Sequence, residues 1–118
     1  MKQFNRITGQ HGEDVAVSYL QNKGYQIIER NFKTSIGEVD IIAQKSGFLI
    51  FVEVKYRTSL YFGEPYEAVN TRKLHKLRQL VDLYYLTKKP FLSPKIEILS
   101  IAKVENEIHI KHIQTIIF

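Results

Sequence analysis

Two carboxylates and a lysine are the residues of this sequence best placed to do chemistry: Asp40, Glu53 and Lys55. Two apolar runs rich in β-branched and aromatic residues, 39–43 and 48–54, flank a short turn, so we predict two adjacent strands. Side chains alternate across a strand, which places Glu53 and Lys55 on one face. Unpaired buried charge is costly, so ionisable groups at the ends of adjacent strands indicate a partner, and a bound divalent cation is one such partner.

An interstrand salt-bridge cluster on an exposed end of the sheet is the second explanation for these three residues, because such ion pairs are common. The spacing alone leaves both explanations open. Glu13 bears on the choice, since the residues that follow it at helical spacing are apolar and place it on or beside the packing face of a helix. Taken by itself, Glu13 is more simply explained as a complement to the positive end of the helix dipole.

Two helices are predicted from apolar residues at helical spacing. The first covers residues 9–23 and ends at the basic residue and glycine of Lys23-Gly24. The second has Asn70 as its N-cap, runs to about Lys89 and stops at Pro90.

Three further strands are predicted at residues 25–32, 95–103 and 107–113. The last two form a hairpin that turns at Glu105-Asn106. The element order predicts a single α/β domain spanning residues 1–118, in which a mixed central sheet is flanked by helices. The second helix is the crossover that brings the fourth strand parallel to a central one.

Basic residues are concentrated in the second predicted helix. Residues 70–89 contain six basic side chains and one acidic side chain, and the whole chain carries a formal net charge of +5. A concentrated basic face predicts a polyanionic partner, and a solvated helix face explains the same pattern. Lys73 lies near the start of this helix at the edge of its apolar stripe, so we expect it to point across the sheet toward the carboxylates.

The composition excludes several classes of protein. The chain has no cysteine, which rules out disulfides and thiolate zinc sites. The first ten residues lack the apolar core of a signal peptide, and no apolar run approaches the roughly 20 residues that a membrane helix needs. We therefore expect a cytoplasmic protein without a membrane segment.

The loop at residues 58–67 contains three aromatic residues, Tyr61, Phe62 and Tyr66. Beside a basic face, such residues can stack on nucleotide bases. Packing of the loop onto the core is the more common explanation.

Asp40 followed by Glu53-Val54-Lys55 resembles the D…(D/E)xK signature of the restriction-endonuclease-like PD-(D/E)xK nucleases, whose αβββαβ core matches the predicted element order. More narrowly, the chain resembles the YraN family, a bacterial family with that fold. The resemblance spans nearly the whole chain. Its motifs are Gly12-Glu13, Ala16, Tyr19-Leu20, Gly24, Arg30-Asn31, Gly37-Glu38-Val39-Asp40, Phe51-Val52-Glu53-Val54-Lys55, Arg57, Phe62-Gly63, Pro65, Glu67-Ala68-Val69 and Lys73.

The resemblance implies a nuclease that uses Mg²⁺ or Mn²⁺. The implied catalytic residues are Glu13, Asp40, Glu53 and Lys55. The implied metal ligands are Asp40, Glu53, the backbone carbonyl of Val54, and Glu13 as a direct or water-mediated ligand. Lys55 would orient or deprotonate the attacking water, or stabilise the transition state. Glu38 shares a face with Asp40 and is a weaker candidate, because a glutamate at the start of a strand also suits a solvent-facing role.

DNA is the substrate that these observations favour. The expected contacts to the DNA backbone are Arg30, Arg57, Arg72, Lys73, Lys76 and Arg78. Backbone contacts position a substrate but carry no base information, so we expect selectivity for structure rather than sequence. A likeness to archaeal Holliday junction resolvases points the same way by analogy, and cleavage of both strands would call for a homodimer. Two alternatives remain open: a non-catalytic DNA-binding or scaffold protein that keeps the fold, and a nuclease directed at RNA.

Overall fold

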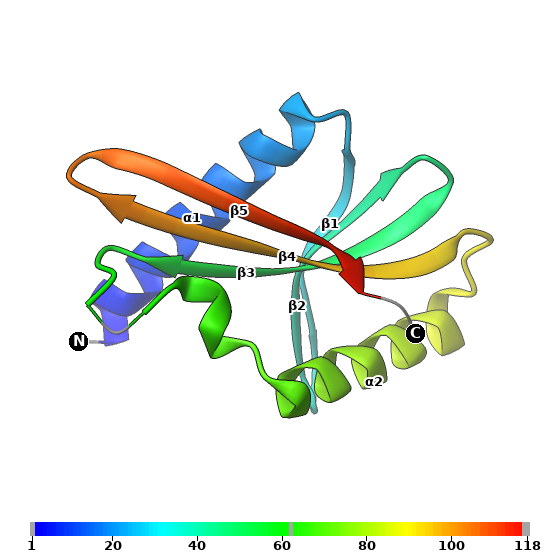
Figure 1. Ribbon diagram of the computed structural model, residues 1–118. Coiled ribbons are helices and arrows are strands. Elements are labelled where there is room, and N and C mark those ends of the chain that lie inside the picture. Colours follow the sequence, from blue (N-terminus) through cyan, green and yellow to red (C-terminus); the bar gives the residue numbers. More distant parts are fainter. Residues whose placement is uncertain (1, 62, 117–118) are drawn as a thin grey trace.

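Five strands form one sheet in the order β1-β2-β3-β4-β5 (Figure 1). The computed structural model describes residues 2–61 and 63–116, with side chains for 11–61 and 63–114; Phe62, from the Phe62-Gly63 motif, lies outside the described residues. The strands are β1 (Gln26–Thr34), β2 (Gly37–Lys45), β3 (Phe48–Arg57), β4 (Ser93–Val104) and β5 (Glu107–Ile116). Helix α1 (Lys2–Asn22) precedes the sheet, and the 3₁₀ helix η1 (Pro65–Ala68) and helix α2 (Thr71–Lys88) connect β3 to β4.

Strand direction makes the sheet mixed. The β3–β4 pair is parallel and the other three pairs are antiparallel. The connection through α2 is therefore the predicted crossover, and β1 and β5 are the two edge strands. Glu105 and Asn106 both have positive φ, at 52° and 66°, which suits the tight turn of the β4–β5 hairpin. The predicted αβββαβ core is thus confirmed, and β5 adds a strand at its edge.

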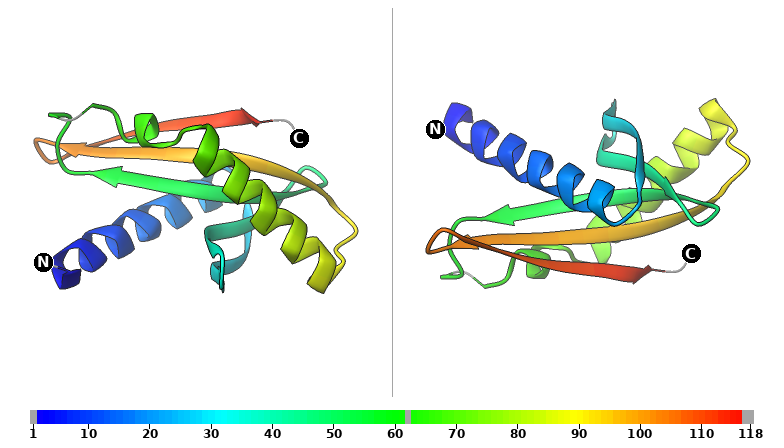
Figure 2. Two further views of the ribbon diagram at one scale, coloured as in Figure 1. Left: turned by 90° about the horizontal axis from the view of Figure 1, so that it is seen from below. Right: turned by 90° about the horizontal axis from the view of Figure 1, so that it is seen from above.

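The two helices cover opposite faces of the sheet (Figure 2). Along β3, Ile50 and Val52 pack in the cluster under α1, whereas Leu49 and Phe51 pack in the cluster under α2. We call these two sides the α1 face and the α2 face. By the same alternation, Glu53 lies on the α2 face. Neither helix in the described part of the chain is long and apolar enough to cross a lipid bilayer.

Helix α1 begins earlier than predicted. The prediction of residue 9 as its first residue is wrong, because the helix starts at Lys2 and continues through two glycines, at positions 9 and 12. Gly12 is buried where α1 crosses β3, and a Cβ placed there would lie 2.6 Å from the Cβ of Tyr56. Glycine is therefore required by close packing at this position and does not act as a helix stop.

A buried polar network ties β4 and β5 to α1 and to Tyr25, the residue that precedes β1. Glu97 is buried on the α1 face of β4, where its Oε1 accepts hydrogen bonds from the hydroxyl of Tyr25 (2.8 Å) and from Nε2 of His112 (2.7 Å). The other ring nitrogen of His112 lies 3.2 Å from the hydroxyl of Tyr19 on α1. Burial raises the pKa of Tyr25 to about 12, so its hydroxyl stays a donor. Both ring nitrogens of His112 thus take part in this network.

Removing His112 is expected to destabilise the fold. The His112→Ala variant leaves Glu97 buried with one partner fewer, so the free energy of unfolding should fall by about 3 kcal/mol in urea denaturation. His109→Ala is the matched control, because His109 is an exposed histidine on the same strand and its loss should change stability by less than about 0.5 kcal/mol. Equal effects of the two substitutions would contradict a structural role for the network.

Candidate metal site and nucleic-acid interface

The site lies where β2 separates from β3. Cα pairing between these strands ends at Ile41 and Val52, and Figure 1 shows the β1–β2 hairpin turning away from β3 beyond this point. At the next position, Oδ2 of Asp40 accepts a hydrogen bond from the backbone N–H of Val54 (2.8 Å). A side chain thus replaces a strand-to-strand backbone bond, and it holds the Asp40 carboxylate against the peptide of Val54.

Three carboxylates meet on the side of this opening that faces α1. Glu13 of α1 and Glu38 and Asp40 of β2 each place an oxygen within 4.8 Å of the other two, and we call them the acidic cluster. Asn31 bridges two of them: with its amide nitrogen turned inward, it donates to Glu13 Oε2 (3.1 Å) and to Glu38 Oε1 (2.7 Å). Asn31 has a φ of 56°, a left-handed conformation that asparagine adopts more readily than most residues.

Glu53 lies on the other side of the opening, where it pairs with two lysines. The residue is only 3% exposed. Its Oε1 lies 3.5 Å from Nζ of Lys55 and 3.3 Å from Nζ of Lys73. The expectation that Lys73 points across the sheet toward the carboxylates is therefore confirmed. Among the described residues, Oε2 of Glu53 is buried with no hydrogen-bond partner.

Burial and repulsion between the carboxylates both raise pKa values in this site. Burial raises the pKa of Asp40 to about 7, with further increases from the charges of Glu53, Glu13 and Glu38 and an opposing effect from the Val54 hydrogen bond. Burial also raises the pKa of Glu13, and the nearby Arg30 opposes this shift. The charge of Glu53 therefore acts on Asp40 even though Glu53 lies outside the acidic cluster.

The donors present fit a hard divalent cation. Asp40 is the member of the acidic cluster on which the charge of Glu53 acts, and carboxylate oxygens are the ligands that Mg²⁺ and Mn²⁺ prefer. The buried Oε2 of Glu53, which has no hydrogen-bond partner in the described part of the chain, is an acceptor of the kind that a cation would satisfy. All four predicted ligand groups lie around this opening. Glu38 was expected to be a weaker candidate, but it lies in the acidic cluster. Its position at the start of a strand did not reveal that β2 turns toward α1.

Asn31 is the contact that sequence reasoning missed. It belongs to the Arg30-Asn31 motif, and that motif was the available signal. Its neighbour Arg30 pairs with Asp14 (2.7 Å) and lies 3.7 Å from Glu13, so this predicted DNA contact borders the acidic cluster.

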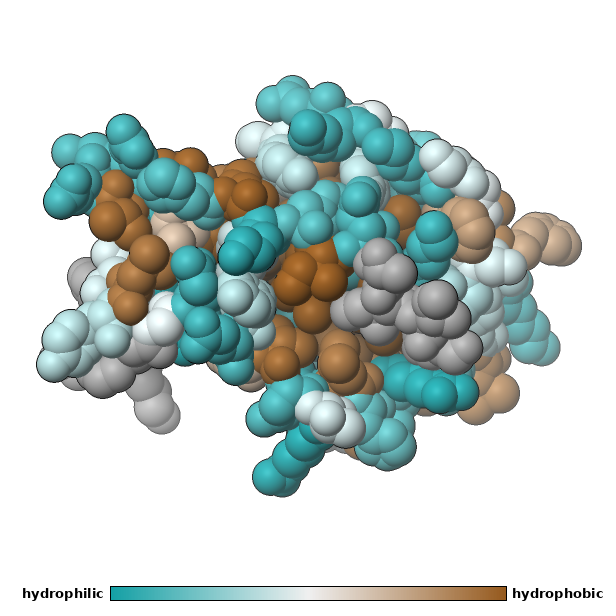
Figure 3. Space-filling view, viewed as in Figure 1, coloured by the Kyte–Doolittle hydropathy of each residue, from teal (hydrophilic) through white to brown (hydrophobic). Residues whose placement is uncertain are grey.

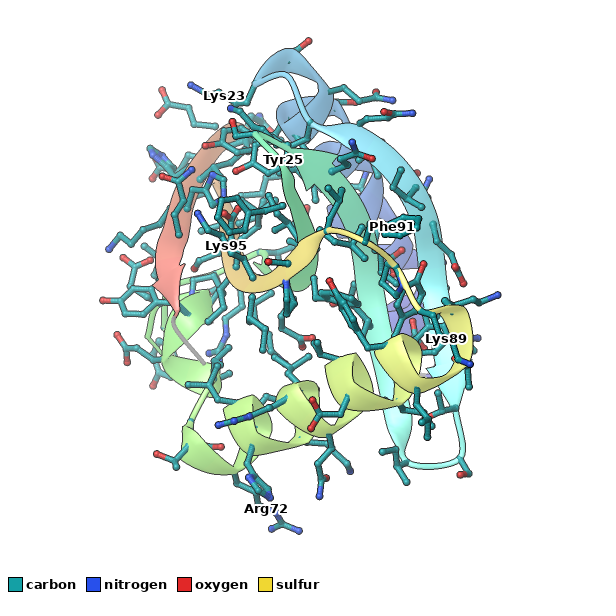
Figure 4. The ribbon with its side chains drawn as sticks, turned by 90° about the vertical axis from the view of Figure 1, so that its right-hand side faces the viewer. Lys23, Tyr25, Arg72, Lys89, Phe91 and Lys95 are labelled. Atoms are coloured by element: carbon teal, nitrogen blue, oxygen red, sulfur yellow. The ribbon has the colours of Figure 1, made fainter. Side chains whose placement is uncertain are left out.

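The other predicted DNA contacts lie on β3 and α2. Arg57 follows Lys55 at the alternating spacing that keeps both on the α2 face. Arg72, Lys76 and Arg78 are exposed on α2, and Figure 4 shows Arg72 projecting from the helix away from the sheet. The basic surface and the carboxylates are joined through Lys73, the helix residue that reaches Glu53.

Asp40 should make the metal-free protein less stable at alkaline pH. Because the folded state raises the pKa of Asp40 from its ordinary value to about 7, the folded state holds a proton that the unfolded state releases in this window. The free energy of unfolding should therefore fall as the pH rises from 5 to 8.5, by about 2 kcal/mol for this group. Asp40→Asn keeps an acceptor for the Val54 N–H and should remove that fall in EDTA.

Thermal denaturation of wild type and Asp40→Asn across this pH range measures the effect. Asp82→Asn, an exposed carboxylate on α2, is the control and should follow wild type. Parallel pH profiles for wild type and Asp40→Asn would contradict the raised pKa.

Comparison with known proteins places the chain in a family. The family described as Uncharacterised protein family UPF0102 matches residues 12–103. A UPF0102 protein of Dictyoglomus thermophilum is 47% identical over 82% of this chain and 83% of its own length. A UPF0102 protein of Syntrophomonas wolfei is 43% identical over 93% and 96%, and one of Persephonella marina is 40% identical over 92% and 94%. The chain therefore belongs to Uncharacterised protein family UPF0102, the YraN family.

Proposed function

We propose that this protein is a metal-dependent nuclease that hydrolyses phosphodiester bonds of DNA and selects its substrates by structure rather than by sequence. The observation that carries the proposal is the state of Glu53. Its Oε2 is buried with no hydrogen-bond partner among the residues that the structure describes, and its charge acts on a second carboxylate, Asp40, whose pKa is raised to about 7. A divalent cation between the two would supply the missing partner and offset the repulsion.

The ligands of that cation would be Asp40, Glu53 and the carbonyl of Val54, with Glu13 and Glu38 as direct or water-mediated contacts. When bound, Mg²⁺ or Mn²⁺ neutralises charge on a phosphate and lowers the pKa of a coordinated water. Asn31 would hold Glu13 and Glu38 in orientation through its two hydrogen bonds.

Two lysines would act on the substrate. Lys55 shares Oε1 of Glu53 with Lys73, so both ammonium groups lie at the edge of the proposed cation site. Lys55 would orient or deprotonate the attacking water, or stabilise the charge that develops on the phosphate in the transition state. Lys73, which reaches the site from the start of α2, would bind a phosphate oxygen.

DNA backbone would run along the exposed side of α2. The basic residues there are suited to phosphates and carry no base information. Cleavage of both strands, or resolution of a junction, would require a symmetric dimer that presents two such sites.

A non-catalytic DNA-binding or scaffold protein is the second candidate. The ion pairs of Glu53 with Lys55 and Lys73 favour it, because they neutralise much of the carboxylate's charge without a metal. The two candidates differ in whether a divalent cation binds and in whether DNA is cut.

A cleavage assay tests the proposal. Labelled four-way junction, flap, single-stranded and duplex DNA are incubated with Mg²⁺ or Mn²⁺ and with wild type or Glu53→Gln. We expect wild type to cut the branched or single-stranded DNA in preference to duplex. Glu53→Gln should lose at least about a hundredfold in rate, because the ligand charge is removed while the side-chain volume is kept. An RNA copy of the best substrate separates DNA from RNA specificity.

Metal binding is the control for this assay. Mn²⁺ should raise the melting temperature of wild type and leave that of Asp40→Asn unchanged, because only the folded wild type offers the site. Equal shifts in the two proteins would count against the metal assignment. DNA binding without cleavage by wild type, in the presence of Mg²⁺ and Mn²⁺, would favour the scaffold.

Lys76 tests the course of the DNA along α2. The Lys76→Ala variant should weaken binding equally for all sequences, and the slope of log affinity against log salt should become shallower by about one unit. Fluorescence anisotropy with DNA in EDTA measures both quantities without cleavage. Lys33→Ala, an exposed lysine on β1, serves as the comparison variant. An unchanged salt slope for Lys76→Ala would place α2 away from the DNA.

A further inference from the structure

A cavity of about 260 Å³ lies on the α2 face, beyond the part of the sheet that α2 covers. Leu99 and Ile101 pack under α1, so the side chains of Ser100 and Ala102 point to the opposite face and form the floor of this cavity. One wall comes from the loop after β3, with Leu60 and Glu64.

The opposite wall of the cavity comes from β5 and contains His109 and Lys111. Figure 3 shows apolar surface between the tip of the β4–β5 hairpin and the loop that follows β3.

The cavity is adjacent to Lys55, the proposed catalytic lysine of β3. In the parallel β3–β4 pair, Lys55 is the register partner of Ser100, and Arg57 is the register partner of Ala102. Neighbouring strands lie about 5 Å apart, so the floor of the cavity begins one strand away from Lys55 on the same face. The backbone N–H of Tyr66 in η1 donates to Oγ of Ser100 (2.9 Å), which fixes η1 beside the floor.

The walls combine apolar surface with groups that can pair with the edges of a base. Leu60, Ala102 and Val104 supply apolar contact. Glu64 can accept hydrogen bonds and Lys111 can donate them. Nζ of Lys111 lies 4.5 Å from the ring centroid of Tyr66, a cation–π contact that holds it at the rim.

We propose that this cavity binds one unpaired nucleobase of the DNA strand whose phosphate lies at Lys55. The volume is just below the roughly 300–1,000 Å³ typical of pockets for drug-sized ligands, so it suits a single ring system and excludes a stacked base pair. A paired base would have to leave the DNA duplex to enter the cavity, whereas unpaired bases at branches, flaps and ends enter at a lower cost in free energy. The position of the phosphate rests on the proposed nuclease function, while the cavity itself does not depend on it.

The loop after β3 supports this assignment. Leu60, which lines the cavity, is 42% exposed, and the residue that follows it, Tyr61, is 84% exposed, so the loop presents apolar and aromatic surface beside the cavity. Tyr66, by contrast, is packed beneath Lys111. Of the two explanations for the aromatic residues of this loop, packing therefore applies to Tyr66 and stacking on a base suits Tyr61.

Amide NMR spectra of the labelled protein in EDTA test the proposal. The probes are a single-stranded thymidine tetranucleotide and a fully paired duplex. We expect saturable shifts at the amides of Leu60, Ala102 and His109 with the single strand and not with the duplex. Ala102→Leu, which fills the floor, should weaken the single-strand response by about tenfold or more. Val104→Phe fills the cavity from its rim and replaces Ala102→Leu if that variant does not fold.

Ile108→Phe is the matched control, because it enlarges an exposed side chain of β5 that points to the face opposite His109. This variant should bind the single strand like wild type. Absence of shifts at the three amides, or equal affinity in wild type and both filled variants, would overturn the proposal. Saturable binding in a protein that cuts no DNA would support the base site and contradict the nuclease function. Cleavage without these shifts would support the nuclease function and contradict the base site.

Discussion

The hydrogen bond from the Val54 N–H to Asp40 joins two strands at the point where they part. The backbone N–H and C=O groups of a β-sheet need hydrogen-bond partners. A strand that turns away therefore leaves an N–H of its neighbour without a backbone partner. The side chain of Asp40 supplies that partner, so β2 can diverge from β3 while the Val54 N–H keeps a hydrogen bond. The divergence in turn makes room for Glu13 and Glu38 on one side and exposes Glu53 to Asp40 on the other. The acidic cluster of the candidate metal site therefore depends on this opening.

The site draws on both layers of the protein. Glu13 comes from α1, and Lys73 comes from α2, although these helices lie on opposite faces of the sheet. An intact sheet would keep the two sets of side chains apart, and the opening between β2 and β3 brings them to one place. The same arrangement explains the charges, since the three carboxylates of the acidic cluster gather toward α1, whereas Lys55 and Lys73 gather around Glu53 toward α2. Charge separation of this kind suits a site that binds a cation and a phosphate side by side.

Much of this arrangement was predictable from local patterns. Alternation in β3 placed Glu53 and Lys55 on one face, and the apolar stripe of α2 placed Lys73 toward them. Asn70 was predicted as the N-cap of α2, and its side chain accepts the N–H of Lys73. Glu38 was predicted only as a weaker candidate and Asn31 was not predicted, because their places in the site depend on a break in pairing between β2 and β3 and on a positive φ at Asn31. The start of α1 was also missed, because the apolar residues at helical spacing on which its prediction rested begin only at Val15.

The contact between Gly12 and Tyr56 has a consequence for the neighbouring residue. Because position 12 has no side chain, α1 lies lower on β3 than an ordinary helix would, and Glu13 is carried down with it to the level of the sheet. The reach of Glu13 toward Asp40 is therefore set by the height of the helix axis more than by the length of its own side chain. A methyl group at position 12 would act as a spacer, lifting the helix and withdrawing one carboxylate from the other two while leaving all three in the sequence.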